Sequence, residues 1–542
     1  MKKSALFFFF CLAGIGCALA CTNLIVTKGA SADGSVMVTY AADSHQLFGE
    51  LYFRPAADYA PGTLMDVNEW DTGRFLGRIP QAAHTYKVIG NMNEHQLIIG
   101  ETTFGGRHEC VDTTAIVDYG TLIYTALQRC RTAREAIALI DELTQTYGYA
   151  SEGESFSIAD TEEAWVMEIM CKVPKFNKKG VNVNKGSVWV AKRIPDGQIC
   201  AHANQARITT IDFNDPENCL YSKDVITHAR EQGFFDGTDA EFSFCDVYAP
   251  LDFSGARGCE ARVWSFFRRF AEGMEVYQDY AMGYDPTNHM PLSVTPSRKI
   301  TVKDMADMMR DHYEGTPMDM TVDAGAGGSH CPYRWRPMDW KYEGKEYVNE
   351  RAIATQQTGW WYVAQARAWN EAGIFWFGVD DAATSPLFPL YTTLSRSPEC
   401  IRQGNGTMLE YSETSMFWMV NRIAQFAYLR YDRIGAEVRD VIDRYEKNLM
   451  ENVTPAIDRT PAAVQDEFSL ANADRLFATW KALDRYLLVK YIDGNIKRQN
   501  PDGSFQTNGF SETIPAFPVQ EDYSDVWKKA VVESNGKVLE VK

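Results

Sequence analysis

A short apolar segment that ends at a cysteine constrains this chain more than any other feature. Residues 1–20 begin with two lysines, continue as an apolar run rich in phenylalanine, and end with the small residues Ala18 and Ala20. This order of features is typical of an export signal that a signal peptidase removes. Cleavage after Ala20 would make Cys21 the first residue of the mature chain.

An N-terminal cysteine carries a thiol and a free α-amine on the same residue. A free thiol titrates near ~8.5 and an α-amine near ~7.7–8.0, so the amine can accept the thiol proton near neutral pH. The thiolate is the reactive nucleophile, and such a residue needs no separate histidine as its base. We therefore expect Cys21 to be the nucleophile of an exported amide hydrolase that is activated when its signal is removed.

Two other interpretations fit the same junction. A cysteine directly after a signal can be a lipid attachment point, which would block the α-amine. The usual lipid-attachment sequence has leucine or a similar residue three positions before the cysteine, whereas Ala18 holds that position here. In the second alternative the chain is cut elsewhere and Cys21 is a buried strand residue. The junction alone does not choose among a nucleophile, a lipid anchor and a structural cysteine.

Composition places the chain among globular proteins. Its 542 residues are 45% hydrophobic and 13% aromatic, which predicts a large core, with one large domain and an appended region. Removing residues 1–20, whose only charges are the two lysines, changes the formal net charge from −18 to −20. Such an acidic protein repels phosphate backbones, so we expect no nucleic-acid partner.

The compartment follows from the signal. Beyond residue 20 no apolar run of the sequence reaches the ~20 residues of a membrane span, so we expect an exported protein without a membrane-spanning segment. It would reside in the periplasm or outside the cell, with a lipid tether at Cys21 as the alternative.

The cysteine pattern favours neither a disulfide framework nor a structural zinc site. Of the 12 cysteines, two lie in residues 1–20, and Cys21 must stay reduced if it is the nucleophile. The nine others are an odd number, have irregular spacing and form no Cys-x-x-Cys pair.

Segments rich in β-branched residues, separated by turn signals, predict that sheet structure dominates the first hundred residues. We expect two hairpins, formed by residues 21–27 with 35–40 and by residues 86–90 with 96–104. Asp33 and Gly34 form the turn of the first hairpin, which brings Asp43 near the level of Cys21.

Helices follow these strands. One is expected at residues 121–129, and another begins at Thr132, which forms a capping box with Glu135. Short strands are then expected at 155–159, 164–169 and 188–191. Sheet, helices and sheet in this order predict an α+β domain in which helices cover stacked sheets.

The second half changes in character. We expect a helix from Thr301 to about Tyr313, aromatic strands within residues 357–394, and helices between residues 416 and 496. The tail from residue 498 is polar, contains proline and glycine, and is expected to be loosely ordered.

Several motifs along the chain resemble one known family, the C69 dipeptidases, a branch of the N-terminal-nucleophile hydrolases. The motifs are Cys21-Thr22, Ala30–Ser35, Asp43-Ser44, Gly100–Phe104, Ala203–Arg207 and Met309–Thr316. The resemblance runs from Cys21 to at least residue 400. It implies a four-layer αββα sandwich over residues 21–400, followed by a helical C-terminal region at 401–497 and the tail at 498–542.

The resemblance also implies an activity and a site. The substrates would be dipeptides, or short peptides cut near a free N-terminus, and the reaction would need no metal and no other cofactor. Cys21 matches the nucleophile, and Asp43 matches an aspartate that contacts the nucleophile region. Asn204 matches an asparagine that holds the reacting amide and its oxyanion, while Thr103 falls where related amidases place an oxyanion-hole asparagine, which implies a substrate-binding position. Arg262 falls near an arginine that supports the nucleophile.

This chain departs from the superfamily pattern just before Asp43, where residues 40–42 are Tyr-Ala-Ala instead of containing an arginine. That contact is either supplied from elsewhere or absent. Each assignment also has a structural alternative: Asp43 as a turn carboxylate, Asn204 as a satisfied loop residue, and Arg262 as a salt-bridged helix residue.

Other functions are consistent with parts of the sequence. A zinc dipeptidase is disfavoured because the nine histidines form no His-Glu-x-x-His motif, although Asp311-His312 remains a candidate pair with distant ligands. Bile-salt or penicillin-type amides are the alternative substrates within the same superfamily. The alternative without catalysis is a lipid-anchored binding protein that uses the aromatic residues 357–394 as its site.

Overall fold

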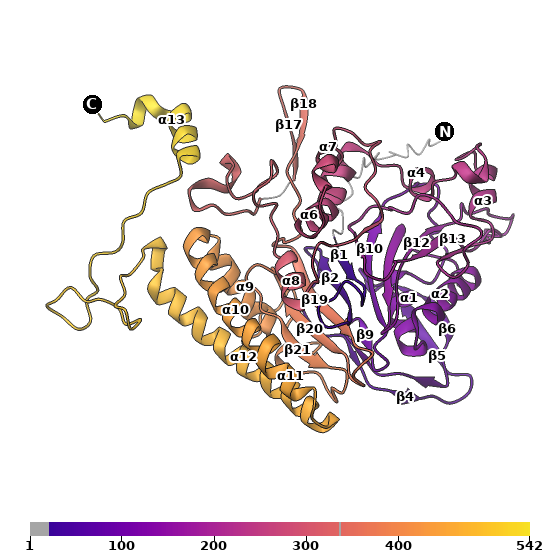
Figure 1. Cartoon of the computed structure of the whole chain (residues 1–542), viewed down its shortest axis with the longest axis horizontal. Helices are drawn as coiled ribbons and strands as arrows, with labels where there is room; N and C mark the ends of the chain where they lie inside the picture. Colours follow the sequence, from indigo (N-terminus) through magenta and orange to yellow (C-terminus); the bar gives the residue numbers. More distant parts are fainter. Residues whose placement is uncertain (1–20, 335–337, 542) are drawn as a thin grey trace, which may run out of the picture.

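A computed structural model of the chain describes residues 21–334 and 338–541 (Figure 1). The predicted export signal, residues 1–20, lies outside the described residues. Two large antiparallel sheets dominate the described chain, one of seven strands and one of eight. The predicted α+β class is therefore confirmed.

The seven-stranded sheet holds β1 between β14 and β2. Its strands, in spatial order, are β16 (Ser293–Val294), β14 (Ile199–His202), β1 (Asn23–Val26), β2 (Val36–Asp43), β19 (Thr358–Ala366), β20 (Ile374–Val379) and β21 (Phe388–Tyr391). β1 and β2 pair with Ile25 opposite Val38, and Gly34 in the turn has a φ of 79°. This pairing confirms the first predicted hairpin. Glycine suits the turn because it adopts a left-handed φ without a steric penalty.

The eight-stranded sheet contains the strands expected in the second hairpin, but they pair differently. Its strands, in spatial order, are β15 (Cys219–Tyr221), β13 (Ser187–Arg193), β12 (Ala164–Cys171), β11 (Gly153–Ala159), β10 (Ile98–Phe104), β9 (Met92–Asn93), β8 (Val88–Ile89) and β3 (Phe53–Arg54). β10 pairs with β9 only at Ile98 and with β11 along its whole length. Within residues 86–90 only Val88 and Ile89 form a strand, β8, and it pairs with β9 and not with β10, so the second predicted hairpin is wrong.

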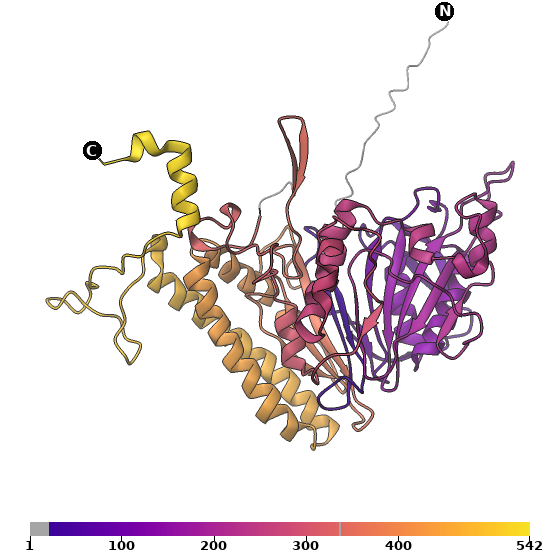
Figure 2. The same cartoon turned by 45° about the horizontal axis from the view of Figure 1, so that its top comes forward.

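Helices cover the outer face of each sheet, while the two inner faces share a core (Figures 1 and 2). α1 (Tyr119–Arg129) and α2 (Ala133–Tyr147) pack on the eight-stranded sheet, where Leu122 and Ile140 meet Phe156. α6 (Ala261–Phe270) and α8 (Val302–Met308) pack on the seven-stranded sheet, where Phe267 and Met305 meet Leu24. Strands buried on both faces read as near-continuous apolar runs.

Capping boxes determine where two of these helices begin. The predicted box of Thr132 and Glu135 begins α2, and a second box of Thr301 and Asp304 begins α8. The expected extension of α8 to Tyr313 is wrong, because the helix ends at Met308 and Tyr313 has a φ of 64°. This end lets the buried Asp311 accept hydrogen bonds from Ser265 Oγ at 2.6 Å and Arg269 Nη2 at 2.5 Å.

The C-terminal helices are α9 (Met416–Ala427), α10 (Ala436–Asn448) and α12 (Ala462–Lys490), as the helical pattern of residues 416–496 predicts. In both views they lie on the side of the molecule away from the eight-stranded sheet (Figures 1 and 2). α12 packs against β21. Residues 525–539 form α13 (Asp525–Leu539), which no pattern in the sequence indicated.

Short elements complete the described chain. They are β4 (Ala57–Asp58), β5 (Leu64–Asn68), β6 (Phe75–Pro80), β7 (His84–Thr85), β17 (Asp339–Tyr342), β18 (Lys345–Val348), α3 (Val225–Glu231), α4 (Phe244–Tyr248), α5 (Phe253–Gly255), α7 (Gln278–Ala281) and α11 (Thr454–Ile457). None of the helices in residues 21–334 and 338–541 is long and apolar enough to cross a membrane. The ten cysteines from Cys21 to Cys400 all carry free thiols in this part of the chain.

A buried ion pair joins α10 to the segment after α8. Arg310 Nη2 and Nη1 donate to the two carboxylate oxygens of Glu446 at 2.5 and 3.0 Å, and both side chains are almost fully buried. The backbone N–H of Leu387 also donates to Glu446, at 2.9 Å. Removing one partner of such a pair leaves an uncompensated charge in the core.

We therefore expect Glu446→Gln to lower the free energy of unfolding by about 3–5 kcal/mol in chemical denaturation. The double variant Arg310→Met with Glu446→Leu is the control, and it should lose less stability because no buried charge remains. A loss below about 1 kcal/mol in Glu446→Gln would contradict this role of the pair.

Candidate active site

Cys21 lies immediately before β1, where the two sheets meet. Its side chain is buried, with 3% of the residue exposed. The Cys21 sulfur lies 3.5 Å from the hydroxyl of Tyr40 on β2 and donates to Glu101 Oε1 on β10 at 3.5 Å. One group therefore comes from each sheet, so the packing of the sheets fixes the surroundings of the thiol.

Arg262 on α6 connects Cys21 to a loop that is distant in sequence. Its Nη1 donates to the backbone oxygen of Cys21 at 2.6 Å and to Thr22 Oγ1 at 2.9 Å. Its Nη2 donates to Asn204 Oδ1 at 2.9 Å. Arg262 is 1% exposed, so both sets of contacts are made away from water. The guanidinium thereby holds the start of β1 and the loop after β14 in a fixed relation.

Asn204 and Thr103 extend this hydrogen-bond chain. Asn204 has a φ of 57°, a left-handed conformation that asparagine tolerates better than most residues. Its Nδ2 donates to the backbone oxygen of Thr103 at 2.7 Å. Thr103 Oγ1 in turn donates to Glu154 Oε2 at 3.1 Å. The structure thus brings four of the sequence-predicted residues into one connected network.

The fifth predicted residue, Asp43, lies at the end of β2 and is fully buried. Its carboxylate accepts from Arg351 Nη2 at 2.6 Å and from Thr358 Oγ1 at 2.6 Å. Burial raises the pKa of Asp43, and the contacts with Arg351 and Thr358 oppose that rise. Arg351 provides a guanidinium beside Asp43 that the sequence around residues 40–42 lacks.

Glu101 and Glu154 form an acidic pair that the sequence analysis did not select. Both are buried, and the hydroxyl of Tyr40 donates to Glu101 Oε1 at 2.5 Å. Burial raises the pKa of both carboxyls, and the charge of Glu101 raises that of Glu154 further. Each glutamate lies within an apolar strand, and this placement was the signal in the sequence. Glutamate is almost never fully buried without a partner, so a carboxylate in such a strand indicates a specific contact.

These charges act on the nucleophile candidate. Burial raises the pKa of the Cys21 thiol well above its ordinary value, and the carboxylates of Glu101 and Asp43 raise it further. The Asp43 backbone N–H and the Tyr40 hydroxyl oppose the rise. In the full chain the nitrogen of Cys21 belongs to the peptide bond with Ala20 and carries no charge. In the full chain, therefore, no α-ammonium at Cys21 opposes the rise in the thiol pKa.

One group of potential metal ligands occurs in residues 21–334 and 338–541. The ligand atoms of Cys245, Asp246 and His289 lie within 4.8 Å of one another. None of the five candidate residues belongs to this group. The candidate pair Asp311-His312 is divided between two sets of contacts, because Asp311 accepts from Ser265 and Arg269 while His312 contacts Glu314 and Tyr333.

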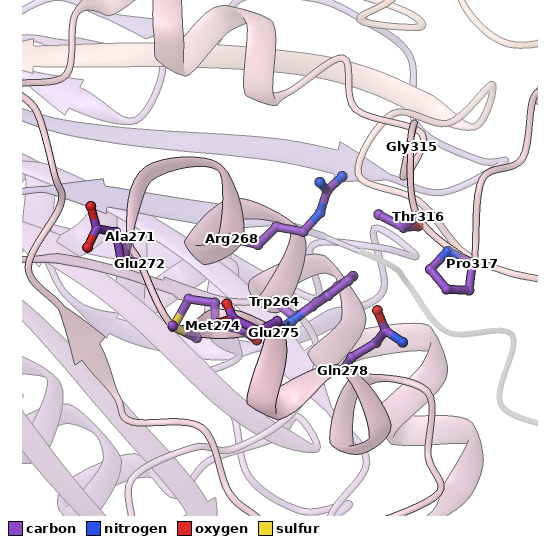
Figure 3. Close-up of a pocket in the computed structure, with 11 residues that line it drawn as sticks. Trp264, Arg268, Ala271, Glu272, Met274, Glu275, Gln278, Gly315, Thr316 and Pro317 are labelled. Carbon is purple, nitrogen blue, oxygen red and sulfur yellow. Dashed lines mark hydrogen bonds between the residues drawn. The ribbon is translucent and has the colours of Figure 1, made fainter.

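A hollow of about 550 Å³ lies on the outer side of α6 (Figure 3). Trp264 and Arg268 extend from the helix toward the loop at Gly315–Pro317. The indole N–H of Trp264 donates to the backbone oxygen of Met274 at 2.8 Å. None of the five candidate residues lines this hollow, so it is separate from the Cys21 network.

Comparison with known proteins supplies the class. The model of peptidase family C69 matches residues 54–444, a segment that contains Thr103, Asn204 and Arg262 and begins after Cys21 and Asp43. The match defines the class of the chain as a peptidase. The chain is a member of peptidase family C69.

Three curated proteins illustrate the similarity. A probable dipeptidase of Salmonella dublin is 25% identical over 361 residues, covering 62% of this chain and 75% of the relative. A probable dipeptidase B of Streptococcus pyogenes serotype M6 is 22% identical over 506 residues, covering 86% and 93%. A probable dipeptidase of Latilactobacillus sakei is 23% identical over 478 residues, covering 83% and 88%.

The electrostatic account of the thiol predicts opposite effects of two substitutions. In the chain that starts at Cys21, Glu101→Gln removes a negative charge beside the sulfur and should lower the thiol pKa by about one unit or more. Tyr40→Phe removes a hydrogen bond to the sulfur and should raise it. The pH dependence of alkylation at Cys21, followed by peptide mass spectrometry, measures both. An unchanged or higher pKa in Glu101→Gln would contradict this account.

Proposed function

We propose that the mature chain is an exported cysteine dipeptidase that hydrolyses dipeptides or short peptides, with Cys21 as its nucleophile. The observation that carries the proposal is a pair of hydrogen bonds. The guanidinium of Arg262 binds both the backbone of Cys21 and the side chain of Asn204. Membership of family C69 and the names of the relatives, each a probable dipeptidase, support the choice of substrate.

The proposed reaction is acyl transfer. The α-amine of Cys21 accepts the thiol proton, and the sulfur forms a bond to the carbonyl carbon of the scissile peptide. The resulting ammonium then gives the proton to the leaving amine as the C–N bond breaks, which leaves a thioester. Water, activated by the same amine, attacks the thioester carbonyl and releases the free acid and the thiol.

The neighbouring residues have separate proposed roles. The amide of Asn204 and nearby backbone N–H groups stabilise the tetrahedral oxyanion, where the loss of one donor typically costs ~2.7–4 kcal/mol of barrier. Arg262 is a positioning residue, because its observed contacts are with Cys21, Thr22, Asn204 and nearby carbonyls. Asp43 orients the ammonium form of the amine, and Thr103 lines the substrate position through its backbone.

Removal of residues 1–20 is the proposed activating step. Burial and the carboxylates of Glu101 and Asp43 raise the pKa of the thiol, and no charged amine opposes them while the Cys21 nitrogen is an amide. A positive charge on the released amine beside the sulfur favours the thiolate. The same step exports the protein and, in this proposal, leaves the amine without a lipid.

The finer architecture also belongs to this proposal. We assign the two stacked sheets and their outer helices to the αββα sandwich of the N-terminal-nucleophile hydrolases. The division into a peptidase domain at 21–400, a helical region at 401–497 and a tail at 498–542 is part of the same assignment.

Cys21→Ala and Cys21→Ser should each reduce dipeptide hydrolysis by roughly 10³-fold or more, because the nucleophile and its positioned base act together. Cys130→Ala, which removes another buried thiol at the end of α1, should leave the rate unchanged. A chelator should have no effect. A dipeptide panel beside conjugated bile salts and penicillins measures these rates, and activity lost to EDTA and restored by zinc would overturn the proposal.

A further inference from the structure

A second hollow, of about 300 Å³, is lined largely by aromatic side chains, and we call it the aromatic pocket. Its lining residues are Gln46, Leu47, Phe48, Glu50, Tyr52, Trp70, Asp71, Gly90, Asn91, Tyr124, Trp360, Phe377 and Gln403. The ring of Tyr124 stacks on Tyr52 at a centroid distance of 3.8 Å and lies 4.6 Å from Trp70. The volume of this pocket is near the lower limit for ligand-binding pockets, and it can hold one amino-acid residue.

Contacts with α1 hold one wall of the aromatic pocket in place. The backbone N–H of Trp70 donates to Asp118 Oδ2, at the start of α1, at 2.6 Å. Trp70 also packs against Gly120, where a Cβ atom would lie 2.7 Å from the tryptophan side chain. Only glycine at this helix position lets the indole approach so closely. Trp70 and the adjacent Asp71 are therefore preorganised, which lowers the cost of binding.

The polar groups of the aromatic pocket favour a cation. Asp71 and Glu50 contribute carboxylates, and none of the described residues that line the pocket is lysine or arginine. Asn91 donates its Nδ2 to the backbone oxygen of Ile99 at 2.8 Å, while its buried Oδ1 has no hydrogen-bond partner among the described residues. An ammonium group supplies both the charge and the donors that these acceptors lack.

Tyr119 links the aromatic pocket to the charged groups near Cys21. The hydroxyl of Tyr119 donates to Asp71 Oδ1 at 2.7 Å. Burial raises the pKa of Tyr119, and the charges of Glu101, Asp71 and Cys21 raise it further. In a bound dipeptide the α-ammonium must lie within about 6 Å of the attacking sulfur, given standard bond lengths and an approach of ~3–3.5 Å.

We propose that the aromatic pocket binds the N-terminal residue of the substrate, with Asp71 receiving the α-ammonium and Tyr52, Trp70 and Tyr124 enclosing an aromatic side chain. The preferred substrates are then dipeptides with an aromatic first residue and a free amine. Asp71, not Glu101, takes this role because Asp71 lines the pocket and Glu101 does not. The inference rests on the proposed function of Cys21.

Asp71→Asn tests the ammonium contact, because asparagine keeps an acceptor for Tyr119 and removes the charge. With Phe-Ala, the variant of the mature chain should lose roughly tenfold to a hundredfold in kcat/KM, mainly through KM. Its preference for Phe-Ala over N-acetyl-Phe-Ala should fall by the same factor. Glu69→Gln removes an acid two residues away that does not line the pocket, and it should change neither quantity.

Trp70→Ala tests the aromatic wall. The variant should lose about tenfold in the ratio of kcat/KM for Phe-Ala to that for Gly-Ala, because only the larger side chain contacts the indole. A general structural defect would lower both rates and leave their ratio unchanged, which contradicts the assignment.

Binding to the Cys21→Ala chain separates this inference from the proposed function. Calorimetric titration with Phe-Ala should show roughly tenfold or greater weakening when Asp71→Asn is added, and titration with N-acetyl-Phe-Ala should not. Equal effects on both ligands, or equal hydrolysis of both by the unsubstituted chain, would overturn the pocket assignment alone. Full hydrolysis by Cys21→Ala would instead overturn the role of Cys21.

Discussion

The buried guanidinium of Arg262 is the interaction on which the site depends. It joins the backbone of Cys21, at the start of β1, to Asn204, in the loop after β14. These two segments are about 180 residues apart, and neither local strand pairing nor a turn fixes their side chains. A charged group with five donors in a rigid fork satisfies several acceptors at once. The helix that carries Arg262 packs on the outer face of the sheet, so the fold itself fixes the backbone position of Cys21.

A second constraint is the group of buried carboxyl side chains near the thiol. Glu101, Glu154 and Asp43 are buried, and burial raises the pKa of each. This environment opposes formation of a thiolate unless a positive charge is added beside it. Release of the α-amine at Cys21 supplies such a charge, and a substrate ammonium beside Asp71 would supply another. The same carboxylates would thus keep the precursor inactive and favour binding of peptides with a free amine.

Sequence reasoning found the features that are local. The Asp33-Gly34 turn, the Thr132 capping box and the aromatic strands after residue 357 all depend on neighbours within a few positions. It failed where distant contacts decide the outcome. α8 ends early because Asp311 pairs with Ser265 and Arg269, and β10 pairs with β11 instead of forming a simple hairpin. Arg351 carried no motif, and Glu101 was not selected although it lies within the Gly100–Phe104 motif. Cys21 was found from the junction that precedes it, whereas Asn204 and Arg262 were found through family resemblance.

The central claim is that the free α-amine of Cys21 is the base that activates its own sulfur. The most direct measurement compares two purified chains, one starting at Cys21 and one retaining Ala20, with intact mass confirming each N-terminus. The account predicts that the chain retaining Ala20 folds equally well, reacts more slowly with iodoacetamide at Cys21, and loses roughly 10³-fold or more in dipeptide hydrolysis. Equal hydrolysis by the two chains would contradict it.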